Sequence, residues 1–78
     1  MDLKQEQILI LKELLHKGGT GNVNEILSLS SGQFEEGFTI ANDMQNKDLL
    51  KLLYSNFNKN LVVAELTLLG ESEYNKLQ

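Results

Sequence analysis

The side chains most able to do chemistry in this sequence are two adjacent carboxylates, Glu35 and Glu36. Neighbouring residues of a helix point about 100° apart, so these two cannot act as acid and base on one substrate. The glycine-rich stretch GGTGN at residues 18–22 has the composition of a phosphate-binding loop. No strand is predicted before it and no lysine stands at the phosphate-binding position, so the stretch does not fit such a loop.

The chain also lacks the residues that a metal site or a covalent catalytic mechanism would need. The only histidine is His16, and the chain has no cysteine. One histidine without clustered ligands does not make a zinc site, and no serine has a base partner. His16 stands near the end of a predicted helix, where its protonated ring would interact favourably with the helix dipole. We therefore predict a protein that is not an enzyme and uses no cofactor.

Length and charge further limit the class of protein to which this chain can belong. The chain has 78 residues, so we expect a single domain over residues 1–78. The net charge is −4, and an acidic balance of this kind repels phosphate. No apolar run approaches the roughly 20 residues of a membrane span, and the first residues lack the pattern of a signal peptide. The resulting prediction is a cytoplasmic protein without membrane contact.

The N-terminal part of the sequence has helical periodicity. Apolar residues spaced three or four apart predict a helix over residues 3–17. Two glycines would end this helix, and the GGTGN stretch would form a loop. Asn22 is a good N-cap for a short second helix, and Glu25 three residues later completes the pattern of a capping box.

A longer helix is predicted over residues 31–46. Ser30 is in position to cap this helix, with Gln33 as its reciprocal partner. Steps of four, three and three residues define one apolar face, which we expect to be buried and which consists of Phe34, Phe38, Ala41 and Met44.

The periodicity changes after residue 48. Two apolar runs, LLKLLYSNF and LVVAELTLL, flank a polar Asn-Lys-Asn and predict a β-hairpin over residues 49–69. Gly70 would end the second strand, and ESEYNKL would form a closing helix with Tyr74 and Leu77 turned inward. This order predicts an α+β domain of three helices, a hairpin and a short C-terminal helix. The hairpin face toward the helices would carry Leu50, Leu52, Tyr54, Val62, Ala64, Leu66 and Leu68.

The predicted order resembles that of the winged helix-turn-helix domains. The segment ELTLLGESEYNKL is similar to the junction between wing and last helix in that family, with Leu66, Thr67, Gly70 and Tyr74 on the shared pattern. The preceding NVNEILSLSSGQFEEGFTIANDMQNKDLLKLL resembles the helix-turn-helix and first wing strand. The likeness extends to the small YjcQ-like winged-helix proteins of bacteria and phages. Its motifs are short and apolar, so they specify packing more than chemistry.

The resemblance implies a DNA-binding protein, and hence a transcriptional regulator, that acts through the helix over residues 31–46. In such domains this helix enters the major groove. The hairpin tip often touches phosphate there. The side chains that the resemblance would place on duplex DNA are Gln33, Thr39, Asn46, Lys47 and Lys59.

The charge pattern favours other interpretations of the same residues. Residues 31–46 contain three carboxylates and no lysine or arginine, a net charge of −3. Residues 47–60 carry three lysines against one aspartate, a net charge of +2. The ordinary interpretations are a solvated helix face and, for Lys59, a polar hairpin turn. The alternative function is a protein–protein interaction by a winged helix that does not bind DNA, with the acidic helix or the sheet docking the partner.

The second face of the predicted hairpin is also apolar. Leu49, Leu53, Leu61 and Val63 would have no helix over them, and exposed patches of this kind mark interfaces. We expect a protein contact there, with a homodimer as the commonest form. The alternatives are that the closing helix covers these residues or that the strands are shorter than predicted.

Overall fold

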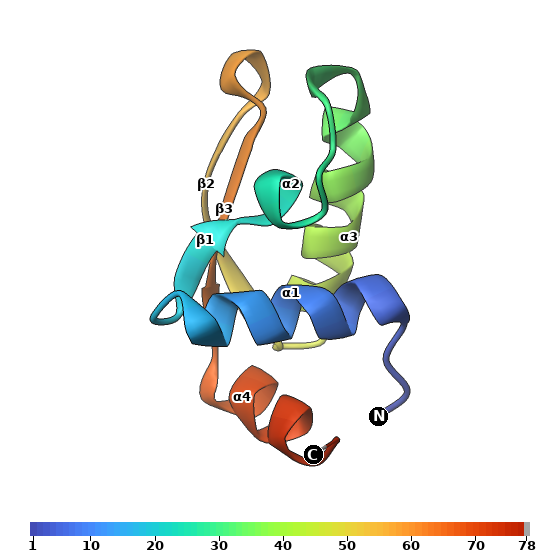
Figure 1. The fold of residues 1–78 in the computed structure, drawn as a ribbon, viewed down its shortest axis with the longest axis vertical. Coiled ribbons are helices and arrows are strands. Elements are labelled where there is room, and N and C mark those ends of the chain that lie inside the picture. The colour runs from blue at the N-terminus through green and yellow to red at the C-terminus, as the bar shows by residue number, and fades with distance from the viewer. Residues whose placement is uncertain (78) are drawn as a thin grey trace.

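The computed structural model describes residues 1–77, which form four helices and one three-stranded antiparallel sheet (Figure 1). The predicted α+β class is confirmed, and the arrangement is compatible with a winged-helix-like fold. Short 3-10 turns stand at Ser31–Gln33 and Phe57–Lys59. The other elements, in chain order, are α1 (Gln5–His16), β1 (Thr20–Asn22), α2 (Val23–Ile26), α3 (Phe34–Asn46), β2 (Leu50–Asn56), β3 (Leu61–Leu66) and α4 (Leu68–Asn75).

The strand β1 occupies part of the predicted GGTGN loop, so that prediction is wrong. β1 pairs antiparallel with β3, and the sheet order is β1-β3-β2. Gly18 and Gly19 have positive φ angles that turn the chain after α1, and the Leu66 amide donates a 2.6 Å hydrogen bond to the Gly19 carbonyl. Because β3 supplies the pairing, this three-residue strand needs no apolar alternation of its own.

The predicted cap at Asn22 is present, whereas Ser30 caps a 3-10 turn and the N-cap of α3 itself is Gln33. The Asn22 side chain accepts a hydrogen bond from the Asn24 amide and caps α2. Gln33 Oε1 accepts a 3.0 Å hydrogen bond from the Ser30 amide, which is the predicted reciprocal contact. This pair closes a 3-10 turn, so α3 itself begins at Phe34, later than predicted.

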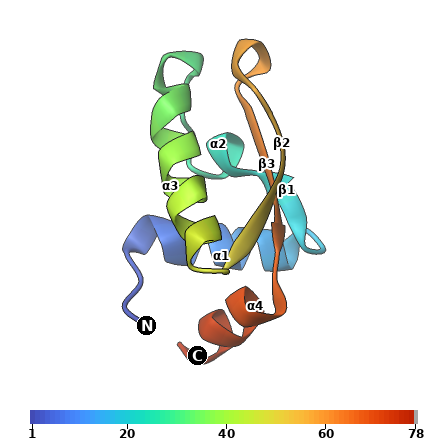
Figure 2. The same ribbon diagram turned by 180° about the vertical axis from the view of Figure 1, so that it is seen from behind.

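The core lies between the helices and one face of the sheet. α1 runs across the lower ends of α3 and the strands, and α4 lies below it (Figure 1, Figure 2). The predicted apolar face of α3 is confirmed, because Phe34, Ala41 and Met44 are buried and Phe38 packs against them half-buried. The other buried apolar residues are Ile10, Leu11, Leu14, Val23, Leu49, Leu50, Val62 and Ala64.

A β-bulge changes which side chains of β2 face the core. Leu50 is buried and Leu52 is half-buried, as predicted, but Tyr54 is 51% exposed. The register to β3 shifts between Leu52 and Tyr54, so that Tyr54 stands opposite Val63. One extra residue in a strand reverses the alternation of its faces. The prediction that Tyr54 packs inward is therefore wrong.

The last strand ends earlier than the sequence predicts. β3 stops at Leu66 and α4 begins at Leu68, whose side chain is 88% exposed instead of packed inward. Thr67 is the N-cap of α4, because its Oγ1 accepts a 2.9 Å hydrogen bond from the Gly70 amide. The same hydroxyl donates to the Asp48 carbonyl at 2.6 Å. One threonine thus starts the helix and ties it to the turn that precedes β2.

Close packing at Gly70 holds α4 against that turn. Gly70 is buried, and a Cβ at this position would collide with the Leu49 carbonyl. Tyr74 packs half-buried against the core, as predicted. Leu77 is 50% exposed, so the prediction that it turns inward is wrong.

We expect Gly70→Ala to lower the free energy of unfolding by roughly 1–3 kcal/mol, because the added methyl group forces the backbone at Leu49 to move. Gly32→Ala is the matched control, since a Cβ there would meet nothing closer than the Ser30 hydroxyl at 3.9 Å. Urea unfolding of both variants measures the difference. Equal stability of the two variants would contradict the close packing at Gly70.

Glu73 anchors the inner side of α4. Its side chain is 10% exposed and accepts a 2.8 Å hydrogen bond from Lys76 Nζ, and the amino group of Met1 lies 3.9 Å away. The hydrogen bond from Lys76 lowers the pKa of Glu73 from its usual 4.5, although burial acts in the opposite direction. The positive charges of Lys76 and the N-terminus lower this pKa as well.

Because this pKa is lowered in the folded state, the free energy of unfolding depends on pH in the acidic range. The ionised carboxylate of Glu73 stabilises the fold above pH 4.5, and the contribution is lost as the pH falls through the folded-state pKa. We expect Glu73→Gln to flatten the decline of the unfolding free energy below pH 4.5. Glu71→Gln, on the same helix, is the control and should keep the decline. An unaltered pH profile in Glu73→Gln would count against the anchor.

Candidate recognition surface of α3 and the wing

The tip of the β2–β3 hairpin and the start of α3 lie at the same end of the molecule (Figure 1, Figure 2). We call the hairpin the wing and its turn, Phe57–Lys59, the wing tip. The Phe57 ring meets the Phe34 ring edge-on with centroids 5.3 Å apart. Helix and wing tip therefore form one continuous surface. This α3–wing surface consists of the wing tip and the exposed residues of α3: Glu35, Glu36, Thr39, Asn42, Asp43 and Asn46.

Asn60 fixes the wing to the turn between α2 and α3. It follows the wing tip with a φ of 54°, a left-handed conformation that asparagine adopts more readily than most residues. Its Nδ2 donates to the Leu29 carbonyl at 2.8 Å, and its Oδ1 accepts from Asn24 Nδ2 at 2.8 Å. These partners lie in α2 and in the turn that follows it, so the wing cannot move away from this segment without losing both hydrogen bonds.

Asn22 extends this network to the sheet. Its Oδ1 accepts hydrogen bonds from the Asn24 amide at 3.2 Å and from the Val62 amide at 2.9 Å. Its Nδ2 donates to the Asn60 carbonyl at 3.4 Å. We call Asn22, Asn24 and Asn60 the asparagine cluster. The cluster supplies partners to backbone groups just where the pairing of β1 with β3 ends.

The close approach of α2 and α3 depends on Gly37. This glycine is buried, and a Cβ there would collide with Asn24 Oδ1. That oxygen is itself buried and has no hydrogen-bond donor within residues 1–77. Glycine lets the two helices come close enough for Asn24 to reach Asn60.

The charge on the α3–wing surface is predominantly negative. Glu35 and Glu36 are exposed, and neither forms an ion pair with another described residue. Lys47 follows the end of α3, and its Nζ lies 3.2 Å from Asp43 Oδ2. This pair cancels one positive and one negative charge, so the start of the helix keeps a charge of −2 from its two glutamates. Lys59 on the wing tip adds one positive charge.

The structure brings two of the predicted DNA-contacting residues together and separates a third. Gln33 and Lys59 belong to the two 3-10 turns, which lie in contact. Lys47 stands beyond the opposite end of α3, and a helix of 13 residues is about 20 Å long. The predicted cations therefore do not form a continuous strip along the helix.

Some of the polar groups predicted to contact DNA already form hydrogen bonds or ion pairs within the protein. Gln33 Oε1 is occupied by the amide and hydroxyl of Ser30, at 3.0 and 3.1 Å. Thr39 and Asn46 are exposed on α3. Lys47 is engaged with Asp43, as described above. Sequence reasoning placed these residues on the surface but gave no information about their partners.

Leu49 does not lie on the uncovered sheet face, and this part of the predicted interface is wrong. The side chain of Leu49 is fully buried, and its carbonyl accepts a 3.3 Å hydrogen bond from the Thr67 amide. The physical reason is that β2 begins only at Leu50, so Leu49 belongs to the turn that α4 covers. The other predicted interface residues lie on the sheet and remain partly or largely exposed: Leu53, Leu61 and Val63.

Two residues that matter for the surface were not singled out from the sequence. Phe57 is 62% exposed yet anchors the wing tip to Phe34. Gln7 is only 3% exposed, and its Nε2 donates to Asp43 Oδ2 at 3.2 Å. Gln7 precedes Ile10, Leu11 and Leu14 by three, four and seven residues, which is the spacing of a buried stripe. That spacing would have indicated its burial.

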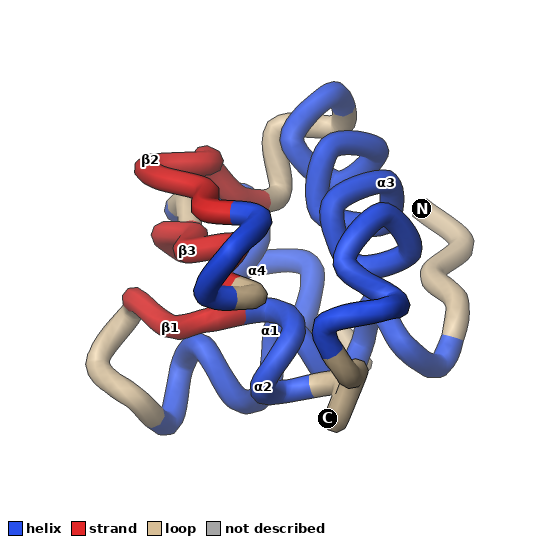
Figure 3. The backbone as a smooth tube through the Cα atoms, turned by 90° about the horizontal axis from the view of Figure 1, so that it is seen from above, coloured by secondary structure: helices blue, strands red, loops and turns tan. Residues whose placement is uncertain are grey.

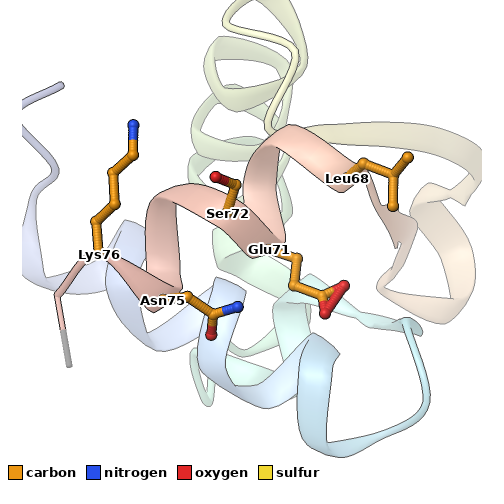
Figure 4. Close-up of a pocket in the computed structure, with 5 residues that line it drawn as sticks. All are labelled: Leu68, Glu71, Ser72, Asn75 and Lys76. Carbon is orange, nitrogen blue, oxygen red and sulfur yellow. The ribbon is translucent and has the colours of Figure 1, made fainter.

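Two hollows in the described part of the chain do not resemble ligand sites. One hollow of about 230 Å³ lies between the start of α1 and α3, which is below the roughly 300–1,000 Å³ of typical ligand pockets. A larger hollow is shown in Figure 4, but α4 alone lines it, so it is the outer surface of one helix. Its lining residues are Leu68, Glu71, Ser72, Asn75 and Lys76.

Within residues 1–77, no three histidine, aspartate or glutamate side chains are grouped to hold a metal ion. No helix in the same range is long and apolar enough to cross a membrane. Comparison of the chain with protein families, with curated protein sequences and with solved structures gave no significant match. The chemistry of the surfaces is therefore the basis for inferring function.

Replacing Asn60 tests whether its side chain holds the wing. Glycine accepts a positive φ, so Asn60→Gly removes the side-chain hydrogen bonds without adding backbone strain. We expect the free energy of unfolding to fall by roughly 1–3 kcal/mol, and amide exchange in the wing to accelerate. Asn58→Gly, at an exposed position in the same turn, is the control for added chain flexibility. If both variants show the same exchange rates, Asn60 does not hold the wing.

Proposed function

We propose that this chain is a winged-helix protein that binds a basic, arginine-containing segment of another protein through its α3–wing surface. The element order α1-β1-α2-α3-β2-β3 and the sheet order β1-β3-β2 support the winged-helix assignment. The attachment of the wing beside α3 supports a shared recognition surface. The observation that carries the choice of partner is the negative charge at the start of α3.

Electrostatics weigh against duplex DNA as the partner. Proteins that bind DNA tightly make on the order of 6–10 phosphate contacts with lysine and arginine, and these contacts supply much of the affinity. Within the described residues, Lys59 is the one lysine of the α3–wing surface without an ion pair. Glu35 and Glu36 would repel phosphate from the same end of the surface. The attraction between cationic side chains and phosphate, which supplies much of the affinity for DNA, is therefore weak on this surface.

The same groups suit an arginine side chain. A guanidinium group forms paired hydrogen bonds with carboxylates and stacks on aromatic rings. Glu35 directly follows Phe34, whose ring contacts the exposed ring of Phe57. Exposed aromatic residues are also common anchors at protein interfaces. Exposed carboxylates in the first turn of α3 and the accessible ring of Phe57 thus lie at the same end of the molecule, where each offers contacts that suit a basic segment.

Duplex DNA remains the second candidate because one observation favours it. The structure places Gln33 and Lys59 at the same end of the molecule, where a helix start and a wing tip could contact adjacent parts of a duplex. On this hypothesis Thr39, Asn46 and Lys47 would contribute further contacts. Regulation of transcription would follow from this mode of binding.

The test compares two probes and two matched variants. The probes are a short arginine-containing peptide and a mixed-sequence DNA duplex, measured by fluorescence anisotropy at low and at physiological salt. We expect the peptide to bind and Glu35→Gln/Glu36→Gln to weaken it roughly 3- to 10-fold, because exposed ion pairs contribute about 0.2–1 kcal/mol each. Asp2→Asn/Glu71→Gln makes the same change in net charge away from the surface and should have little effect.

Two outcomes would overturn the proposal. Equal weakening by both double variants would show that only net charge matters. Tighter binding of the duplex than of the peptide, reduced by Lys59→Gln, would support the second candidate instead.

A further inference from the structure

The sheet has a face that no described helix or strand covers. α3 packs against the inner face of β2 and β3, which carries the buried Leu50, Val62 and Ala64 (Figure 3). On the outer face, the strand register places three pairs of residues side by side. These cross-strand pairs are Lys51 with Glu65, Tyr54 with Val63, and Asn56 with Leu61.

The outer face is apolar in its middle. Tyr54 is 51% exposed, and Val63 and Leu61 are half-buried. The hydroxyl of Tyr54 accepts a 2.9 Å hydrogen bond from Asn56 Nδ2, which fixes the ring over the strands. Leu53, in the bulge, adds another side chain that is 47% exposed.

A partner on this sheet would lie on its face and not extend its edge. β2 is an edge strand, and such strands can accept a further strand through free backbone groups. Here Gln45 Oε1 accepts a 2.7 Å hydrogen bond from the Leu52 amide, and the bulge follows immediately. Both features block regular strand addition in the middle of β2. The accessible apolar side chains are therefore available only to a partner packed face to face.

We propose that a second copy of this chain occupies the outer face, in a symmetric dimer. A two-fold axis parallel to the strands and midway between β2 and β3 would lay β2 of each copy over β3 of the other. Because Lys51 and Glu65 are cross-strand partners, this axis sets each Lys51 against Glu65 of the second copy. Neither residue forms an ion pair with another residue in the described part of the chain.

The same operation matches the apolar residues. It places Tyr54 over Val63 of the second copy, and it does so twice because the contact is reciprocal. The strand register thus makes the face complementary to itself in both charge and hydrophobicity. This inference does not depend on what the α3–wing surface binds.

The size of the face sets the expected affinity. Strands lie about 4.8 Å apart and rise about 3.3 Å per residue, so two strands of six residues present much less than the roughly 800 Å² per partner of a standard interface. We therefore expect a weak, transient dimer.

A charge exchange tests the symmetric arrangement. Sedimentation velocity over a range of protein concentrations should show dimers of the wild-type chain. We expect Lys51→Glu and Glu65→Lys each to raise the dissociation constant at least about tenfold, because each change creates two like-charged contacts. The double variant Lys51→Glu/Glu65→Lys should restore the dimer. The exchange recovers the opposite charges between the copies as well as across the hairpin of each copy.

A second pair of variants is needed because a charge reversal that disturbs the hairpin would also abolish the dimer. These two variants leave the charges unchanged. Tyr54→Ser should weaken the dimer, whereas Leu68→Ser, which removes an even more exposed apolar side chain from α4, should not. Circular dichroism verifies that each variant is folded. A chain that stays monomeric at millimolar concentration, a double variant that stays dissociated, or a dimer lost in Leu68→Ser but kept in Tyr54→Ser would each overturn the proposal.

Discussion

The hydrogen bonds of the asparagine cluster are the constraint on which the rest of the structure depends. Asn22, Asn24 and Asn60 come from the end of β1, the start of α2 and the end of the wing tip, and they meet in one place. A small domain has little apolar surface to bury, so polar contacts that fix the position of its hairpin matter more than they would in a larger protein. The cluster joins the wing to the end of β1, to α2 and to the turn that precedes α3.

The fold of this part of the molecule and the charge on its surface have separate physical causes. The wing tip lies next to the start of α3, and the first turn of that helix exposes Glu35 and Glu36. Backbone geometry is set by packing and hydrogen bonds, whereas the partner that we propose rests on the charges of the exposed side of the same helix. The two can therefore diverge without any change in the fold.

Small local features decide which apolar side chains reach the surface. The bulge in β2 turns Tyr54 outward, and the Thr67 cap converts the predicted strand end into a helix with Leu68 exposed. The same cap brings α4 over Leu49 and buries it. The outer face of the sheet therefore contains other residues than strict alternation would place there, and the shifted register that pairs Tyr54 with Val63 is the basis of the dimer that we propose.

The sequence by itself determined the features that depend on near neighbours along the chain. Helical spacing identified α1 and α3 with the buried face of α3, alternation and turn residues identified the hairpin, and Asn22 and Ser30 were recognised as caps. Gln7 shows that one buried polar residue was also within reach of the same periodicity. Only the tertiary structure decided the pairing of β1, the bulge, the burial of Leu49 and the partners of Asn60. These features arise from contacts between segments tens of residues apart, and local periodicity carries no information about which distant backbone group will be satisfied by which side chain.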